Sequence, residues 1–477
     1  MTTPGFQHIA VIGGGFSGTM AALNLARLGA APLRVTLLNH GSPAGRGIAY
    51  GTRRPEHLLN VAARNMSALP DHPTHFVDWL RSRSEFNDVT DGELREMFVP
   101  RKIYGDYICG LVANCLHPID PRSQVDLQVI DDEAVHVSME ADEASITLKN
   151  GAPVAADTVL LATGNQPPAT FRCNAPLTYD RRYCADPWGD WHKQLPEPGR
   201  RIVLLGTGLT AVDVIVSLTA LHWQGTITAV SRSGLLPRPH FRGIAYPDYI
   251  PADFESLTLG ELVHVVQQQC QRLERMSQNP AIAIDKLRPY TQRIWRSLSL
   301  SDRQTFVRNY SAKWNSIRHR IAISVHQCVT DALDTGQLEI LERQVESLEA
   351  TDDCLNVVLQ DNAGEHSAIA AELVINCTGP QARMSHTDSP LLRNLLDDGL
   401  IRSDELDMGI EVNDDYQAVD AAGQASGRLY AIGPLLRGTR WETTAVPELR
   451  GQAMAIAHSI LQQQAQPPQE HVIEYCI

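Results

Sequence analysis

Short runs of apolar residues, each ended by glycine, recur along the chain and predict buried parallel strands. The first run spans residues 8–12 and stops at three consecutive glycines. An Ala/Leu-rich stretch at 19–28 then predicts a helix, and Gly29 follows it where a helix C-terminus commonly places glycine. A further apolar run at 34–38 completes a predicted strand–helix–strand unit within about 30 residues.

The same order of strand, glycine turn and helix recurs in the middle of the chain. Residues 201–205 predict a strand, a helix is expected to end near Leu221, and residues 226–230 predict the next strand. Two more apolar runs, at 158–162 and 373–377, each end in a Thr-Gly pair. Each of them follows a stretch of alternating or turn-rich sequence that predicts a β-meander.

These repeats predict an α/β fold with two Rossmann-like, three-layer dinucleotide-binding domains and an inserted helical region. The first domain is expected to be discontinuous, with its parts at 1–170 and 370–477. The second domain is expected at 171–369, with the helical insertion at about 250–330, where Leu, Val, Ile and Trp recur at spacings of three and four. The Gln/Pro-rich stretch at 462–469 predicts an exposed C-terminal tail.

Composition excludes several classes of protein. The 477 residues are about three times a typical domain, and 43% hydrophobic with 20% charged residues is typical of a packed chain. A net charge of −14 argues against a nucleic-acid partner. Without a basic leader or an apolar run of about 18 residues, no export and no membrane association are expected. Nine scattered cysteines without a CxxC pair are typical of reduced thiols in the cytoplasm.

The first glycine turn has the spacing of a dinucleotide site. Gly13 would make the tight turn, Gly15 would let the backbone approach a pyrophosphate, and Gly18 would allow close helix packing. The phosphates would then meet the N-terminus of the following helix. The acidic residue that usually ends the second strand is replaced by Asn39, whose amide can still hydrogen-bond a ribose. This turn is predicted to bind a dinucleotide.

The second glycine turn, Gly206 to Ala211, leads to a strand that ends in Ser231 and Arg232. An acid at that position would repel a 2′-phosphate, whereas an arginine offers charge-assisted hydrogen bonds to one. The turn therefore predicts NADPH rather than NADH as the second cofactor. The duller alternative is a surface arginine that happens to follow a strand.

An FAD-like site followed by an inserted NADP-like site is the order of flavoenzymes in which the nicotinamide reduces the flavin. Several longer segments also resemble a bacterial family of FAD/NAD(P)-binding proteins. They are Gly45–Gly51, His57–Val61 with Met66 and Ser67, Tyr104–Tyr107, Gly206–Asp213, Trp314 with Arg318–Arg320, and Ile432–Leu435 with Trp441–Pro447. That family is similar to the N-hydroxylating and other class B flavin monooxygenases and includes a flavin-dependent urate hydroxylase. The resemblance covers nearly the whole chain and implies FAD and NADPH as cofactors.

The sequence departs from known flavoprotein patterns at two places. The Gly-Asp pair that commonly contacts the ribityl chain is Gly433-Pro434 here. The FxGxxxH fingerprint of Baeyer-Villiger and classical flavin monooxygenases is absent between Gly164 and Gly206, where the segment 183–188 stands instead. Ketone oxygenation is therefore disfavoured.

The resemblance implies an NADPH-dependent flavin monooxygenase that uses dioxygen to hydroxylate a small polar, nitrogen-containing molecule through a C4a-(hydro)peroxyflavin. Two alternatives stay open: an NADPH:acceptor flavin reductase without oxygen insertion, and a non-catalytic FAD/NADP-binding redox sensor. The substrate stays open, as does whether the chain forms a homo-oligomer. No metal site is expected, because His72 and His75 have no partner at metal-ligand spacing.

Candidate catalytic residues lie in two places. His57 and Asn60 could hydrogen-bond the reactive flavin or the substrate, or could merely stabilise a turn. Arg318 and Arg320 lie in a stretch, residues 254–330, with 11 basic and 5 acidic residues. This stretch is either a solvated helical face or the wall of an anion site. We predict that Arg318 or Arg320 faces the cleft between the domains and holds either the NADPH phosphates or an anionic group of the substrate.

Most candidate cofactor contacts follow from the glycine turns, the Thr-Gly pairs and the family-like segments. Arg101 and Tyr104 are expected at the flavin phosphate or ring edge, with plain surface and core roles as the alternative. Thr443 and Thr444 precede a predicted helix whose N-terminus could face the flavin pyrimidine. The full set is Gly13, Gly15, Phe16, Ser17, Gly18, Asn39, Arg46, Met66, Ser67, Arg101, Tyr104, Thr163, Gly164, Gly206, Thr207, Gly208, Leu209, Thr210, Ser231, Arg232, Gly379, Gly433, Thr443 and Thr444.

Overall fold

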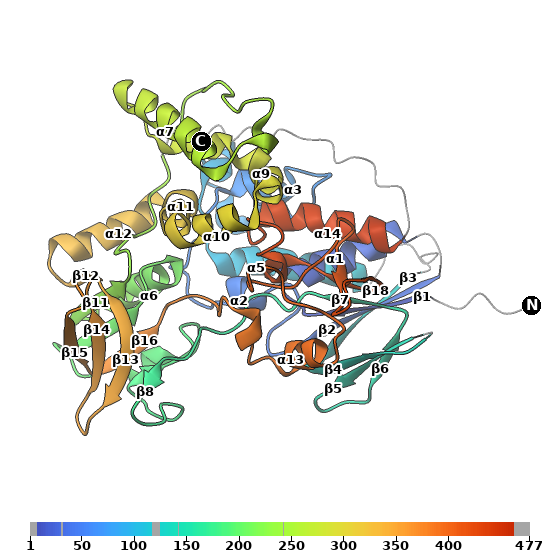
Figure 1. Cartoon of the computed structure of the whole chain (residues 1–477), viewed down its shortest axis with the longest axis horizontal. Coiled ribbons are helices and arrows are strands. Elements are labelled where there is room, and N and C mark those ends of the chain that lie inside the picture. Colours follow the sequence, from blue (N-terminus) through green and yellow to red (C-terminus); the bar gives the residue numbers. More distant parts are fainter. Residues whose placement is uncertain (1–6, 30–31, 117–124, 142, 242, 462–477) are drawn as a thin grey trace, which may run out of the picture.

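The computed structural model describes residues 7–461, apart from 30–31, 117–124, 142 and 242. Two units built on sheets lie on opposite sides of the molecule in Figure 1, and a group of helices lies above and between them. The tail predicted at 462–469 lies outside the described residues. Among the described helices, none combines the length and the apolar character that a membrane span requires.

The first unit is built on a six-stranded sheet. Its strands lie in the order β17 (Gln417–Val419), β18 (Ala425–Ala431), β7 (Thr158–Leu161), β1 (Gln7–Ile12), β2 (Leu33–Asn39) and β3 (Val125–Asp131). The central strand β1 runs parallel to both neighbours, with Ile9 opposite Val35 on one side and Thr158 on the other. The last four residues of β1 are buried, as expected for a strand covered on both faces.

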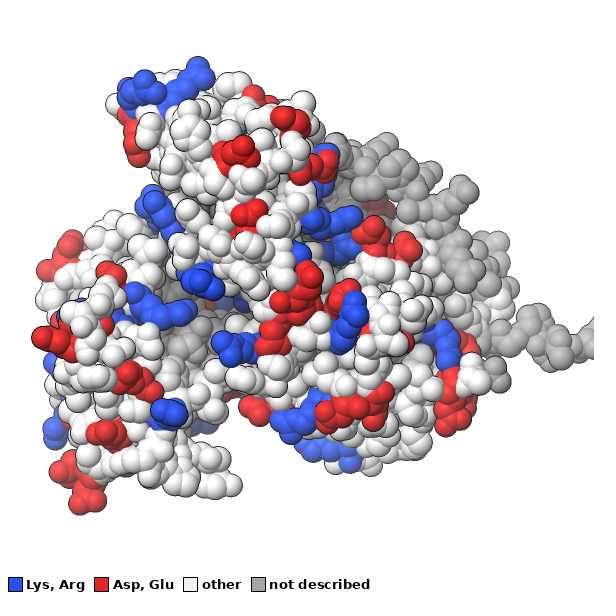
Figure 2. Space-filling model, viewed as in Figure 1, with Lys and Arg blue, Asp and Glu red and all other residues white. Residues whose placement is uncertain are grey.

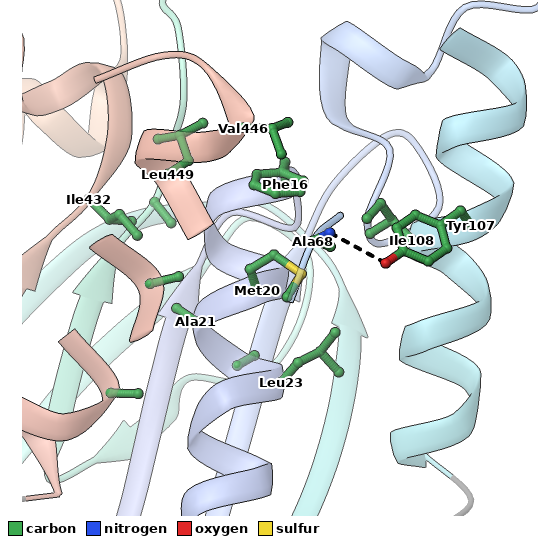
Figure 3. Close-up of a cluster of buried hydrophobic side chains, with 14 of the residues drawn as sticks. Phe16, Met20, Ala21, Leu23, Ala68, Tyr107, Ile108, Ile432, Val446 and Leu449 are labelled. Atoms are coloured by element: carbon green, nitrogen blue, oxygen red, sulfur yellow. Dashed lines mark hydrogen bonds between the residues drawn. The ribbon is translucent and has the colours of Figure 1, made fainter. Parts of the chain in front are cut away.

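Helices cover one face of this sheet and a meander covers the other. Figure 3 shows the helical face, where side chains of α1 (Phe16–Leu28), α5 (Arg101–Leu116) and α14 (Val446–Ile460) gather in one hydrophobic cluster. The opposite face packs against α13 (Pro390–Asp397) and the antiparallel strands β4 (Ala134–Met139), β5 (Ala144–Leu148) and β6 (Val154–Ala156). Alternate residues of β1 enter the two clusters, because neighbouring side chains of a strand point to opposite faces.

The second unit repeats this design with a smaller sheet. Its strands lie in the order β12 (Leu338–Glu342), β11 (Thr226–Ser231), β10 (Arg201–Leu205), β16 (Leu373–Asn376) and β9 (Tyr183–Cys184). One face packs against α6 (Leu209–Ala220) and α12 (Ile323–Asp334). The other face packs against a four-stranded sheet of β15 (His366–Ala371), β14 (Leu355–Gln360), β13 (Gln344–Ala350) and β8 (Arg172–Cys173).

The remaining helices are shorter or belong to the insertion. The insertion comprises α7 (Leu259–Arg275), α8 (Ala281–Lys286), α9 (Thr291–Ser297), α10 (Leu300–Asn309) and α11 (Ser311–Arg318). The first unit also carries α2 (Gly47–Tyr50), α3 (His75–Arg81) and α4 (Asp91–Glu96). Short 3₁₀ turns lie at Ala63–Asn65, Ser84–Phe86, Trp191–Gln194, Phe254–Ser256, Arg288–Tyr290, Met384–His386 and Gly433–Leu436.

The predicted fold class is confirmed, but two predicted boundaries are wrong. Strand β16 pairs in parallel with β10 of the second unit, so this unit extends past the predicted boundary at 370. Helix α12 packs on α6 and the second sheet, so the insertion ends near Arg318 and not near 330. Both errors have the same cause, because a sheet accepts strands and covering helices that lie far apart in the sequence.

Candidate functional site

One large cleft of about 2460 Å³ separates the two units. Its walls include Gly13–Ser17 and residues 162–164 from the first unit, and Leu209 and Thr210 from the second. Residues 318–320 of the insertion complete it. Figure 2 shows Lys and Arg side chains along the hollow between the parts of the molecule. The first glycine turn and the start of α6, which directly follows the second glycine turn, therefore line one continuous space.

The glycines of the first turn have distinct roles. Gly13 has φ of +117°, and a Cβ at this position would lie 2.2 Å from the carbonyl oxygen of Ala162. A Cβ on Gly18 would lie 2.0 Å from the Gly13 carbonyl oxygen, so this glycine allows the helix to pack closely on the turn. A Cβ on Gly15 would meet only Gly47, at 3.8 Å, and Gly15 lines the cleft. The structure thus leaves open space beside Gly15 and no room for a side chain at Gly13.

Unsatisfied polar groups support a bound ligand in this part of the cleft. The hydroxyl of Thr163 and the side-chain oxygen of Gln166 are buried without a hydrogen-bond partner among the described residues, and both residues line the cleft. Helix α1 begins at the cleft with no side chain capping its free N–H groups. A dinucleotide has the phosphates and hydroxyls that could satisfy these groups, so the residues present fit FAD.

Asn39, at the end of β2, bonds to the protein backbone where a contact with a ribose was predicted. Asn39 lines the cleft, but its amide nitrogen donates to the carbonyl oxygen of Ser42 at 2.5 Å, and its side chain lies against Gly14. Asp132 also reaches the cleft, a residue that the sequence analysis missed. Its carboxylate accepts hydrogen bonds from the backbone N–H groups of Asn150 and Gly151, which fasten the meander to the sheet.

Several predicted cofactor contacts are structural instead. Tyr104 is fully buried between Phe16 and Phe76, and burial raises the pKa of its hydroxyl well above the usual value. The Ser67 hydroxyl donates to the His72 carbonyl oxygen at 2.7 Å. The Thr443 hydroxyl donates to the carbonyl oxygen of Gly433 at 3.0 Å. The predicted contacts that do not line the cleft are Gly18, Ser67, Tyr104, Gly433 and Thr443 of the first unit and Gly206, Thr207, Gly208, Ser231 and Arg232 of the second. The neighbours Met66, Pro434 and Thr444 do line it.

Two arginines expected at the cofactor are held by carboxylates. Arg46 lines the cleft, but its guanidinium forms an ion pair with Asp106 on α5. Arg101 forms a bidentate ion pair with Asp213, at 2.7 and 3.0 Å. Asp213 lies on α6 of the second unit, so Arg101, which also lines the cleft, contacts the other nucleotide unit. Asp213 was missed, although an acid within the apolar run Ala211–Val216 is a signal for a buried partner.

His57 also contacts the second unit. Its Nε2 lies 2.8 Å from the Ser217 hydroxyl and 3.2 Å from the Asp213 carbonyl oxygen, and its Nδ1 lies 2.9 Å from the Thr52 hydroxyl. A carbonyl oxygen can only accept, so Nε2 carries the proton and Nδ1 accepts from Thr52. Burial lowers the pKa of His57, which keeps the ring neutral.

The second glycine turn is shaped like the first. Gly206 has φ of +116°, and a Cβ there would lie 2.4 Å from the Cys377 carbonyl oxygen, whereas the space around Gly208 is open. The Thr207 hydroxyl donates to the Leu235 carbonyl oxygen at 2.7 Å and lies 2.8 Å from the Ser231 hydroxyl. The two hydroxyls thus hold the loop in shape.

Arg232 directly follows strand β11 and lies on the surface of the second unit. Its side chain is exposed and has no ion pair or hydrogen bond among the described residues. On the other side of the turn, Gly379 from the second Thr-Gly pair lines the cleft in a left-handed conformation, as Gly164 does in the first unit.

The three arginines of the basic insertion that line the cleft, Arg288, Arg318 and Arg320, each meet a carboxylate. Arg320 is buried and makes two hydrogen bonds of 2.9 Å to Asp285. The Arg318 Nε lies 3.1 Å from the carboxylate of Glu442, which precedes α14. Arg288 pairs in the same way with Glu448, at 2.7 and 3.0 Å. Arg288 and Arg318 are therefore matched by acids of the C-terminal segment, and Arg320 by an acid of the insertion itself.

Two further residues of the cleft complete this wall. His319 faces the cleft, and burial together with the charges of Arg318 and Arg437 lowers its pKa to about 4. Asn60 lines the cleft too, and its backbone oxygen accepts a hydrogen bond of 2.8 Å from the His240 ring. His319 was not among the predicted site residues, and its position between two arginines was the signal available.

This arrangement, with two strand–glycine turn–helix units opening onto one cleft, defines the fold as that of a flavoprotein with two dinucleotide-binding domains. The sequence model of an FAD-NAD(P)-binding family matches residues 10–166. This match confirms the prediction that the first unit contains a dinucleotide-binding domain. Uncharacterized proteins of Mycobacterium tuberculosis and Mycobacterium bovis are 21% identical over 537 aligned positions, covering 97% of this chain and 96% of each relative.

Solved structures share the fold over almost the whole chain. The ornithine hydroxylase of Pseudomonas aeruginosa has a TM-score of 0.63 at 17% identity and covers 96% of this chain and 99% of its own. The L-lysine 6-monooxygenase of Pseudomonas syringae has a TM-score of 0.63 at 15% identity, with coverage of 96% and 99%. The cadaverine monooxygenase of Erwinia amylovora, solved with FAD, has a TM-score of 0.63 at 13% identity, with coverage of 98% and 96%. The predicted resemblance to N-hydroxylating flavin monooxygenases is thus confirmed for the fold.

The different surroundings of Gly15 and Gly13 give a test of the FAD site. Gly15→Val should fold, because its backbone is extended and its Cβ has space, but the side chain would project toward the pyrophosphate position. We expect purified Gly15→Val to lose most bound FAD while its circular dichroism stays that of the wild type. Gly13→Val should instead fail to fold, because its Cβ would overlap the Ala162 carbonyl. Full FAD content in Gly15→Val would contradict the assignment.

Proposed function

We propose that this chain is an NADPH-dependent flavin monooxygenase that hydroxylates a small polar, nitrogen-containing molecule. The observation that carries the proposal is the single cleft lined by the first glycine turn and by Leu209 and Thr210, the first residues of α6, which would bring two dinucleotides together. Its fold, shared along almost the whole chain with N-hydroxylating monooxygenases, supports the same reaction class. All eight described cysteines are free thiols, which supports our proposal of a cytoplasmic enzyme.

Bound FAD would accept hydride from NADPH and then react with dioxygen, and the finer proposal is oxygen transfer through a C4a-(hydro)peroxyflavin. The chain would contribute binding, orientation and exclusion of water. Gly15 and the N-terminus of α1 would hold the FAD pyrophosphate, and Thr163 with Gln166 would donate or accept at its polar groups. Asn60 and His319 would face the substrate side of the cleft.

Anaerobic mixing with NADPH tests this function. We expect the FAD of the purified protein to be bleached by NADPH, and re-oxidation by dioxygen to pass through a transient flavin–oxygen adduct in stopped-flow absorbance. Reduction without an adduct would favour the NADPH:acceptor reductase. No reduction at all would favour the non-catalytic redox sensor.

The choice between NADPH and NADH tests Arg232. A charge-assisted hydrogen bond contributes roughly 1.5–3 kcal/mol, so Arg232→Ala should weaken NADPH binding about 10- to 150-fold. NADH binding should change little, because NADH has no 2′-phosphate. Titration of both coenzymes against the oxidised protein measures the two affinities. Equal losses for both coenzymes would show that Arg232 does not contact the 2′-phosphate.

Arg318 and Arg320 both line the cleft and both meet a carboxylate, and their removal tests the basic wall. Arg320→Ala leaves Asp285 without its partner, so it should lower the free energy of unfolding by about 3 kcal/mol in denaturant titration. Arg318 lines the cleft beside Arg320, and we expect Arg318→Ala to change function. A phosphate role predicts weaker NADPH binding. A substrate role predicts normal flavin reduction with more hydrogen peroxide released per NADPH consumed. Unchanged affinity and unchanged peroxide yield would exclude both roles.

A further inference from the structure

Two side chains of the first unit contact one face of a single helix in the second. The Arg101 guanidinium meets the Asp213 carboxylate through two hydrogen bonds, and the His57 ring meets the Ser217 hydroxyl at 2.8 Å. Asp213 and Ser217 are four residues apart on α6 and therefore lie on the same face of that helix. Both contacts are buried, with about a tenth of the Arg101 and Asp213 side chains exposed.

These two side chains form one rigid patch on the first unit. The backbone N–H of Arg101 donates to the His57 carbonyl oxygen at 2.8 Å, and the Arg101 Nε donates to the Leu58 carbonyl oxygen at 2.9 Å. The other ring nitrogen of His57 is held by Thr52. Neither side chain can therefore shift unless the loop at 57–58 and the start of α5 move with it. The patch fixes both the distance and the rotation of α6, because it holds the helix at two points one turn apart.

Trp188 covers this patch from the cleft side. Its ring lies edge-on to His57, with centroids 6.0 Å apart, and the Arg101 guanidinium lies 5.9 Å from its ring centre. Trp188 belongs to the segment 183–188, which stands where the FxGxxxH fingerprint is missing. Its ring lines the cleft and shields the ion pair from water, which strengthens the pair electrostatically.

Helix α6 is the element whose position matters most for the proposed reaction. It begins directly after the second glycine turn, so its N-terminus would hold the NADPH pyrophosphate. A displacement of α6 would therefore move the nicotinamide relative to the flavin. Group transfer needs the reacting atoms within about 3–3.5 Å, and a misplacement of 1 Å can cost about 100-fold in rate.

We propose that Arg101 and His57 are positioning residues that clamp α6 to the first unit and so set the distance between nicotinamide and flavin for hydride transfer. This inference rests on the proposed function only for its kinetic consequence. The clamp itself is a contact between side chains that both units contribute.

The double variant Arg101→Met/Asp213→Leu tests the clamp, because it removes the ion pair without leaving a buried charge. At saturating NADPH we expect the anaerobic rate of flavin reduction to fall about 10- to 100-fold. The Kd for NADPH should stay within about threefold, because Arg232 and the glycine turn are untouched. Arg101→Lys, which keeps the charge, should recover part of the rate. A general loss of structure would not produce this separation of rate from affinity.

A second variant and a second readout keep the test independent of folding and of turnover. Ser217→Ala removes only the hydrogen bond between His57 and the Ser217 hydroxyl, and it should lower the reduction rate by a smaller factor. Hydrogen–deuterium exchange should rise in residues 209–220 of both variants and stay unchanged in residues 16–28. The matched control is Arg402→Met/Glu411→Leu, which removes a bidentate pair of 2.8 Å bonds that lies entirely within the first unit.

The results separate the two proposals. Wild-type reduction rates together with unchanged exchange in residues 209–220 would overturn the clamp. An equal rise of exchange in those residues in the Arg402→Met/Glu411→Leu control would overturn it as well. If NADPH fails to reduce even the wild-type flavin, the proposed function falls, and the exchange measurement still decides whether the clamp exists.

Discussion

The buried ion pair between Arg101 and Asp213 is the contact on which the shape of the cleft depends. Each nucleotide unit has its own sheet and its own hydrophobic clusters, so neither unit determines where the other lies. A charged pair of this kind tolerates little displacement, because breaking a buried pair by loss of one partner costs about 3–5 kcal/mol. The glycine turns supply two nucleotide sites, and this contact makes them one cleft.

Similar pairs attach the helical insertion to the C-terminal part of the chain. Arg288 meets Glu448, and Arg318 meets Glu442, although the partners lie more than 120 residues apart in sequence. Ion pairs between the basic insertion and the acidic C-terminal segment therefore explain part of the uneven charge along the chain. Glu442 has a left-handed backbone, with φ of +59°, an arrangement that costs energy and is held by its partners Trp314 and Arg318.

The candidate site was predictable where backbone geometry decides the residue type. Gly13, Gly18 and Gly206 tolerate no side chain, because carbonyl groups lie within 2.5 Å of where a Cβ would be. Hydroxyls and arginines were less predictable. Ser67, Thr443 and Arg101 have the chemistry of ligand contacts, yet Ser67 and Thr443 are satisfied by nearby backbone carbonyls and Arg101 by a carboxylate of the second unit. A side chain that can bind a ligand can equally bind a carbonyl or a carboxylate, and its sequence neighbours do not say which.

The sequence by itself determined the strands, the turns and the class of cofactor, because these depend on local periodicity and on glycines at fixed spacing. The tertiary structure alone decided that β16 joins the second sheet, that α12 covers it, and that Arg101 faces Asp213. The physical reason is the range of the interactions. Hydrophobic period and backbone conformation act over a few residues, whereas sheet pairing and buried ion pairs join segments that only the folded chain brings together.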